Sequence, residues 1–161
     1  MIRSLAIAAA LLSPFAVSAK DLPTQPYLPM DLAVKAADVA VKTCAAKGFN
    51  VSAVVVGRDG STQVVLKADR SGPHTVSSAT GKAFTSAAMG RDTAGLADFI
   101  ASKPANEGLR DMDPRMVIQA GGLPVKFEKA LVAGIGVGGA PSGDIDAACA
   151  TEGLKAIGAT L

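Results

Sequence analysis

The feature that most constrains the fold is a run of alternating glycines near the C-terminus, in the sequence ALVAGIGVGG of residues 130–139. Glycine inside a strand marks a place where another backbone comes close. Residues 123–127 and 130–137 are β-rich apolar runs around the polar pair Glu128-Lys129, a pattern typical of two paired strands with a short turn. We therefore expect a hairpin whose second strand is covered by a closely packed helix.

The first residues have the features of an export signal. Arg3 precedes an unbroken apolar run over residues 5–12, and residues 17–19 supply small residues at the positions that a signal peptidase reads. The apolar run is far shorter than the roughly 20 residues that span a bilayer. We predict that residues 1–19 are a signal peptide, that the mature protein is periplasmic or secreted, and that it has no membrane span after cleavage.

Charge and aromatic content argue against nucleic acid as a partner. The formal net charge is only +2, and one of the basic residues belongs to the expected signal peptide, so no basic footprint for nucleic acid or an anionic membrane remains. Aromatic residues make up 4% of the chain, with no Trp and one Tyr, which leaves no stacking platform for bases.

The chain has two cysteines, Cys44 and Cys149. Export would place them in an oxidising compartment where a disulfide persists. Cys44 lies late in the first expected helix and Cys149 early in the last, so a bridge requires these helices to lie side by side. The alternative is that both are small buried apolar residues without a bond.

The remaining pattern predicts one domain. Residues 20–29 contain three prolines and form an extended lead-in, and residues 30–161 form the domain. We expect helices over 31–48, 75–89, 93–100 and 143–159, with Ser142 as the N-cap of the last, and strands over 51–56, 63–67, 116–119, 123–127 and 130–137. The order α-ββ-αα-βββ-α indicates an α+β fold, a central antiparallel sheet of about five strands covered by helices.

The glycine run also fits the expression G-x-G-x-x-G between Gly134 and Gly139. A dinucleotide site needs this turn after the first strand, with a long helix, a further strand and an acidic residue behind it. The residues after Gly139 form only one expected helix, so we do not expect nucleotide binding here.

His74 is the single histidine, which excludes any site that needs two imidazoles. It follows Gly72-Pro73 at the start of the helix over 75–89, and one histidine suffices as an axial ligand of haem iron. Met89 and Met112 are alternative soft ligands. The competing interpretation is an exposed, inert His74 and methionines that fill the core.

Three cations flank the same helix, namely Arg70, Lys82 and Arg91. Cations of this kind pair with carboxylates such as haem propionates through charge-assisted hydrogen bonds. The helix has Ser78, Lys82 and Ser86 on its polar side, so the alternative is a solvated helix face.

Several segments resemble the GlcG/HbpS family of haem-binding proteins. They are GGLPV at 121–125, the glycine run at 130–139, VVVGRDG at 54–60 and the lysine-alanine pattern within 82–87. The resemblance covers residues 30–158. It implies a compact, profilin-like domain with a central antiparallel sheet, assembly as a homo-oligomer, and a tetrapyrrole such as haem as ligand.

Together these observations predict an exported haem-binding protein that serves haem storage, sensing or degradation. His74, Arg70, Lys82 and Met89 are the candidate cofactor-binding residues, with His74 as the candidate iron ligand. Two alternatives stay open: a non-catalytic oligomeric interaction module, and an enzyme that acts on a small hydroxy- or keto-acid, which only the family context suggests.

Overall fold

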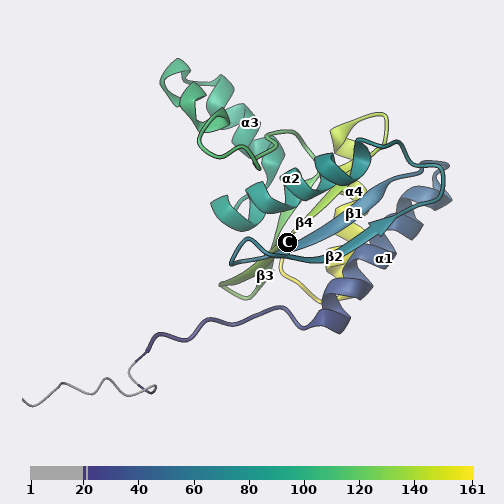
Figure 1. Cartoon of the computed structure of the whole chain (residues 1–161), viewed down its shortest axis with the longest axis horizontal. Coiled ribbons are helices and arrows are strands. Elements are labelled where there is room, and N and C mark those ends of the chain that lie inside the picture. The colour runs from purple at the N-terminus through teal and green to yellow at the C-terminus, as the bar shows by residue number, and fades with distance from the viewer. Residues whose placement is uncertain (1–19, 21) are drawn as a thin grey trace, which may run out of the picture.

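The computed structural model describes Lys20 and residues 22–161 (Figure 1). The expected signal peptide, residues 1–19, lies outside the described residues. Among these there is no helix whose length and hydropathy would let it cross a membrane. The helices are α1 (Met30–Ala46), α2 (Thr75–Met89), α3 (Thr93–Ala101), the 3-10 helix η2 (Pro104–Arg110) and α4 (Gly143–Ala156). The strands are β1 (Ser52–Gly57), β2 (Thr62–Lys67), β3 (Gly122–Phe127) and β4 (Ala130–Gly138).

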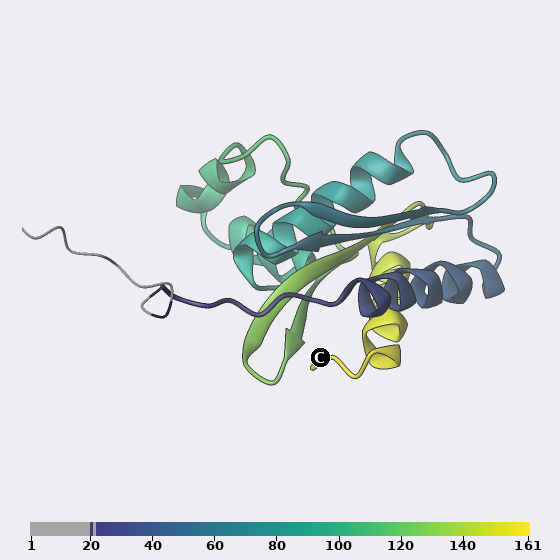
Figure 2. The same ribbon diagram turned by 60° about the horizontal axis from the view of Figure 1, so that its bottom comes forward.

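The four strands form one antiparallel sheet in the order β2-β1-β4-β3. Each hairpin predicted from the sequence is present, and the two hairpins join through β1 and β4 in the middle of the sheet. Helix α2 covers one face, and α1 with α4 covers the other (Figure 2). The antiparallel pairing confirms the α+β class and excludes a dinucleotide-binding doubly wound sheet.

Strand β4 packs closely against α2 because glycines alternate along the face that it turns to the helix. Gly134, Gly136 and Gly138 face α2, and a Cβ atom on Gly136 would overlap the backbone carbonyl oxygen of Ala79. At Gly134 the overlap would be with the carbonyl of Ala83. The helix backbone therefore rests directly on the strand backbone, as the glycine run predicted.

The opposite face of the sheet carries the larger hydrophobic core. Helices α1 and α4 bring small residues such as Ala36, Ala40 and Gly153 close together, because a Cβ atom on Gly153 would meet the Ala36 carbonyl. A disulfide joins Cys44 of α1 to Cys149 of α4, with a Cα separation of 5.6 Å. The first and last helices of the domain are thus tied covalently on one sheet face.

The expected fifth strand over 116–119 is absent among the described residues, so that prediction was wrong. Its apolar residues are β-like, but the segment crosses α2 instead of joining the sheet. The Val117 N–H donates to the Thr85 hydroxyl at 2.9 Å, and that hydroxyl contacts the Val117 carbonyl at 3.3 Å. A side chain of α2 therefore pairs with the Val117 N–H, which a neighbouring strand would otherwise bind.

The crossing segment also corrects the expected polar face of α2. Lys82 and Ser86 are buried, not solvated. A Cβ atom on Gly81 would collide with the Val117 side chain, and Gly122 lies against the Lys82 carbonyl. Because other segments of the chain cover α2 on two sides, the polarity of its residues did not identify the side that is exposed to solvent.

Candidate functional site: two cavities at opposite ends of helix α2

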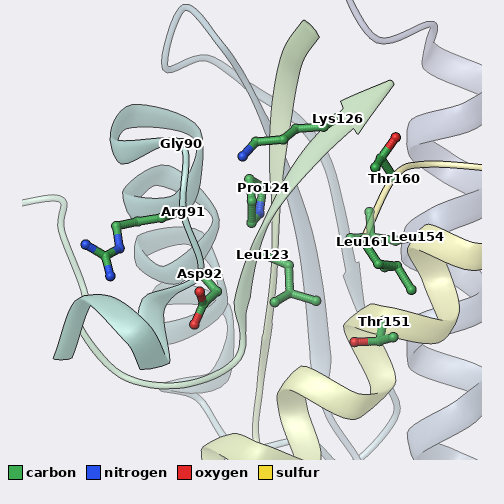
Figure 3. A pocket seen from close by; sticks show the side chains of 10 residues that line it. All are labelled: Gly90, Arg91, Asp92, Leu123, Pro124, Lys126, Thr151, Leu154, Thr160 and Leu161. Atoms are coloured by element: carbon green, nitrogen blue, oxygen red, sulfur yellow. The ribbon is translucent and has the colours of Figure 1, made fainter. Parts of the chain in front are cut away.

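A groove of about 460 Å³, which we name the α2–β3 groove, lies beside the C-terminal end of α2 (Figure 3). Four segments build it: the α2–α3 connection, β3, α4 and the C-terminal residues. Its lining residues are Gly90, Arg91, Asp92, Leu123, Pro124, Lys126, Thr151, Leu154, Thr160 and Leu161.

Local backbone chemistry shapes the wall made by the α2–α3 connection. Gly90 ends α2 in the left-handed conformation, with φ of 66°, and its N–H donates to the Ser86 carbonyl. Such a helix end favours glycine. Asp92 then caps α3 by accepting a hydrogen bond from the Gly95 N–H at 2.6 Å. Two helices therefore meet at a short connection that places Arg91 beside the groove.

The groove is amphipathic. Leu123, Leu154 and Leu161 supply apolar walls, and Lys126 supplies positive charge. The α2–α3 connection adds one charge of each sign, from Arg91 and Asp92, and Figure 3 shows the Arg91 guanidinium directed away from Lys126. Figure 3 shows Lys126 extending from β3 toward the α2–α3 connection, with Leu123 and Leu154 deeper between β3 and α4. The arrangement suits a ligand with an apolar body and acidic groups at its edge.

The two cations are held differently. The Arg91 guanidinium donates to the Gly95 carbonyl at 2.9 Å and lies 5.3 Å from the centre of the Phe99 ring. These contacts restrict the orientation of its planar donor fork. The backbone of Lys126 is fixed by a bridge to Thr160, whose N–H donates to the Lys126 carbonyl at 2.8 Å.

A second cavity, the His74 cavity, has a volume of about 250 Å³ and lies at the other end of α2. His74 is the N-cap residue of α2 and is exposed. The other lining residues come from α2, the crossing segment, the connection between β4 and α4, and α4 itself. They are Ser78, Lys82, Gln119, Gly139, Ala140, Pro141, Ser142, Gly143 and Asp146.

A buried ion pair forms part of this cavity's wall. The Lys82 Nζ donates to Asp146 Oδ2 at 2.8 Å and to the Val137 carbonyl at 3.1 Å, and the two side chains are 2% and 3% exposed. The Ala140 N–H donates to the other Asp146 oxygen at 3.0 Å. Burial raises the pKa of Asp146, while Lys82 and the N–H groups of Ala140 and Gly139 oppose that rise. The pair fastens α2 to the first turn of α4 and to the end of β4.

The structure separates the predicted cofactor-binding residues. His74 and Lys82 line the same cavity, but the Lys82 ammonium is already paired with Asp146. Arg70 is exposed in the turn before α2 and lines neither cavity. Met89 ends α2, about 21 Å from its start at a rise of 1.5 Å per residue. A single iron therefore cannot bind both His74 and Met89.

Two residues that the sequence interpretation missed are central to these sites. Lys126 lies within the strand expected over 123–127 and was not singled out, and only the fold brings it to the α2–β3 groove. Asp146 lies in the first turn of α4, where an acidic residue complements the helix dipole, and it also pairs with Lys82 across 64 positions of sequence. Arg91 was a candidate for propionate binding, and it lines the groove.

Other metal or thiol chemistry has no support in the part of the chain that the structure describes. No group of three or more His, Cys, Asp or Glu side chains is positioned there to hold a metal ion. Both cysteines are used in the disulfide, which leaves no free thiol among those residues.

Fold and cavities define a class: a single α+β domain, built on a four-stranded antiparallel sheet, with an amphipathic groove beside one edge strand. Residues 28–155 match the family described as haem degrading protein HbpS-like. The chain therefore belongs to the HbpS-like family, which confirms the resemblance seen in the sequence.

Solved structures agree with this assignment. A double mutant of HbpS from Streptomyces reticuli shares 40% identity, with a TM-score of 0.80, over 89% of this chain and 95% of that chain. A second HbpS structure shares 41% identity, with a TM-score of 0.80, over 87% and 96%. A complex of PduOC with haem has the same fold at 22% identity, with a TM-score of 0.76, over 84% and 98%. Among curated protein sequences no significant match was found.

Proposed function

We propose that this protein binds haem and that the macrocycle lies in the α2–β3 groove. The observation that carries the proposal is the pairing of apolar walls with two cations, since haem has an apolar ring and two propionates. The groove volume of about 460 Å³ falls within the roughly 300–1,000 Å³ of ordinary ligand sites. Membership of the HbpS-like family and the haem complex of PduOC support the same ligand.

Each group in the groove has a role in this proposal. Arg91 and Lys126 hold the propionates through charge-assisted hydrogen bonds. Leu123, Leu154 and Leu161 cover the ring and keep water from it. Bound haem would supply an iron centre for redox chemistry with peroxide.

The candidate iron ligands are Met89 and His74. No His, Met or Cys lines the groove, but Met89 immediately precedes Gly90, which does. Met89 is therefore the candidate soft ligand on this side of the molecule. His74 remains the alternative, although the polar cavity of about 250 Å³ beside it offers little apolar cover for a macrocycle.

In biological terms we propose an exported haem-binding protein, periplasmic or secreted, for haem storage, sensing or degradation. The disulfide between Cys44 and Cys149 supports export, because such bonds persist in oxidising compartments. Assembly as a homo-oligomer is also proposed. Tyr27, Met30 and Val34 are exposed and lie within eight positions of sequence at the start of the domain, and they would be covered by a second copy.

Haem titration followed at the Soret band tests this function. We expect a saturable shift for the wild type. The double variant Arg91→Ala, Lys126→Ala should bind about tenfold more weakly, because each exposed ion pair contributes about 0.5–1 kcal/mol. Lys155→Ala is the matched control, since Lys155 is an exposed lysine of α4 that pairs with Glu152 outside the groove.

Two further variants separate the candidate sites. His74→Ala should leave haem affinity unchanged, and Met89→Leu should alter the position of the band if Met89 is the ligand. Absence of any saturable band in the wild type removes the haem function. Loss of haem binding in His74→Ala, with unchanged binding in the groove variants, would instead place the haem site at the other end of α2.

A further inference from the structure

The His74 cavity has features of a second, smaller ligand site. Its volume of about 250 Å³ is below the range of drug-sized pockets, so it admits a ligand of only a few heavy atoms. Polar side chains reach it from several segments: His74 and Ser78 on α2, Gln119 on the crossing segment, and the ion pair of Lys82 and Asp146.

The ion pair of Lys82 and Asp146 has one more hydrogen-bond donor than its protein partners use. An ammonium group has three N–H donors, and Lys82 uses two of them, on Asp146 and on the Val137 carbonyl. At 2% exposure the third donor has little access to bulk water. Both oxygens of Asp146 already accept hydrogen bonds, one from Lys82 and one from the Ala140 N–H. The ion pair therefore offers a spare donor to the cavity.

The other polar walls add donors. His74, Ser78 and Gln119 line the cavity, and their side chains make no hydrogen bond to another residue of the described chain. An imidazole, a hydroxyl and an amide can each donate to an oxygen atom. Acceptor oxygens on a ligand would satisfy these groups together with the third Lys82 donor.

We propose that the His74 cavity binds a small carboxylate. The local charge selects a monoanion: the charges of Lys82 and Asp146 cancel, so the hydrogen-bond donors, and not a net positive charge, favour the ligand. A phosphate dianion would meet the buried Asp146 carboxylate without a second cation to balance it. This site lies at the opposite end of α2 from the α2–β3 groove, so haem bound in the groove would not fill it.

The test uses acetate as the probe and the imidazole of His74 as the reporter. His74 is the only histidine of the chain, so its Cε1–H signal in a two-dimensional NMR spectrum is unambiguous. With the full mature protein at constant pH and ionic strength, acetate up to about 50 mM should shift this signal saturably. Ser78→Ala should weaken acetate binding about fivefold, because one hydrogen bond is lost.

Ser77→Ala is the matched control, because Ser77 is the exposed neighbour of Ser78 and does not line the cavity. It should bind acetate as the wild type does. A non-saturable shift, or an equal shift with sodium chloride, overturns the proposal, as does a Ser78→Ala variant with unchanged affinity. Tighter binding of inorganic phosphate than of acetate overturns the choice of a monoanion. Ser78→Leu, which fills the cavity, should abolish the acetate shift while haem still shifts the Soret band.

Discussion

Replacing Gly136 by alanine tests how closely helix α2 lies on strand β4. The new methyl group would lie 2.5 Å from the Ala83 nitrogen and would overlap the Ala79 carbonyl oxygen. Both are backbone atoms of α2, so no side chain can rotate away and the helix itself must move. Overpacking typically costs about 1–3 kcal/mol, and overlap with two backbone atoms places Gly136 at the upper end, at about 3 kcal/mol or somewhat more. The reduced chain entropy of the unfolded state returns at most about 1 kcal/mol.

The expected net loss for Gly136→Ala is therefore about 2–3 kcal/mol in the free energy of unfolding, measured by urea denaturation with the disulfide intact. Gly108→Ala is the matched control, because nothing lies within 4 Å of the added carbon in η2. It should change the stability by less than about 0.5 kcal/mol. A loss below about 1 kcal/mol for Gly136→Ala would refute direct contact between helix and strand backbones.

Two further predictions concern the covalent link and the buried ion pair. Removing the disulfide, in the double variant Cys44→Ala, Cys149→Ala, should lower the free energy of unfolding by about 2–4 kcal/mol, because the bond joins positions 105 residues apart. An unchanged free energy of unfolding in that variant would contradict this. Lys82→Met should cost about 3–5 kcal/mol near pH 7, because it leaves the Asp146 carboxylate buried without its partner. Burial raises the pKa of Asp146 above 3.8, and losing Lys82 raises it further, so the variant should lose stability as pH rises from about 4 to 7. Urea denaturation at several pH values checks this, and a pH-independent deficit would count against it.

Local sequence patterns were sufficient for most of the fold. The glycine alternation in β4 predicted a helix on the strand backbone, and Gly136 shows this contact. Apolar periodicity placed α3 within one residue of its observed end. The strand expected over 116–119 was wrong because its pairing partner is the Thr85 side chain, and strand propensity carries no information about such a contact.

The sites were less predictable because they depend on tertiary proximity. Lys82 has the polarity of a surface residue, and only the approach of Asp146 from α4 makes its burial tolerable. The α2–β3 groove joins three distant parts of the sequence, around residues 90–92, 123–126 and 151–161, so Arg91 could be suspected but Lys126 could not. His74 attracted attention as the single histidine, a compositional signal that does not reveal which cavity it borders.

Mapping the position of the haem iron by NMR tests the account most directly. Ferric haem broadens the NMR signals of nearby nuclei, so adding it to the isotope-labelled mature protein maps where it binds. The account predicts broadening of backbone amide signals at residues 90–92 and 122–126, on the two sides of the α2–β3 groove. Broadening centred on His74 and residues 139–143 would contradict the groove and place haem in the His74 cavity.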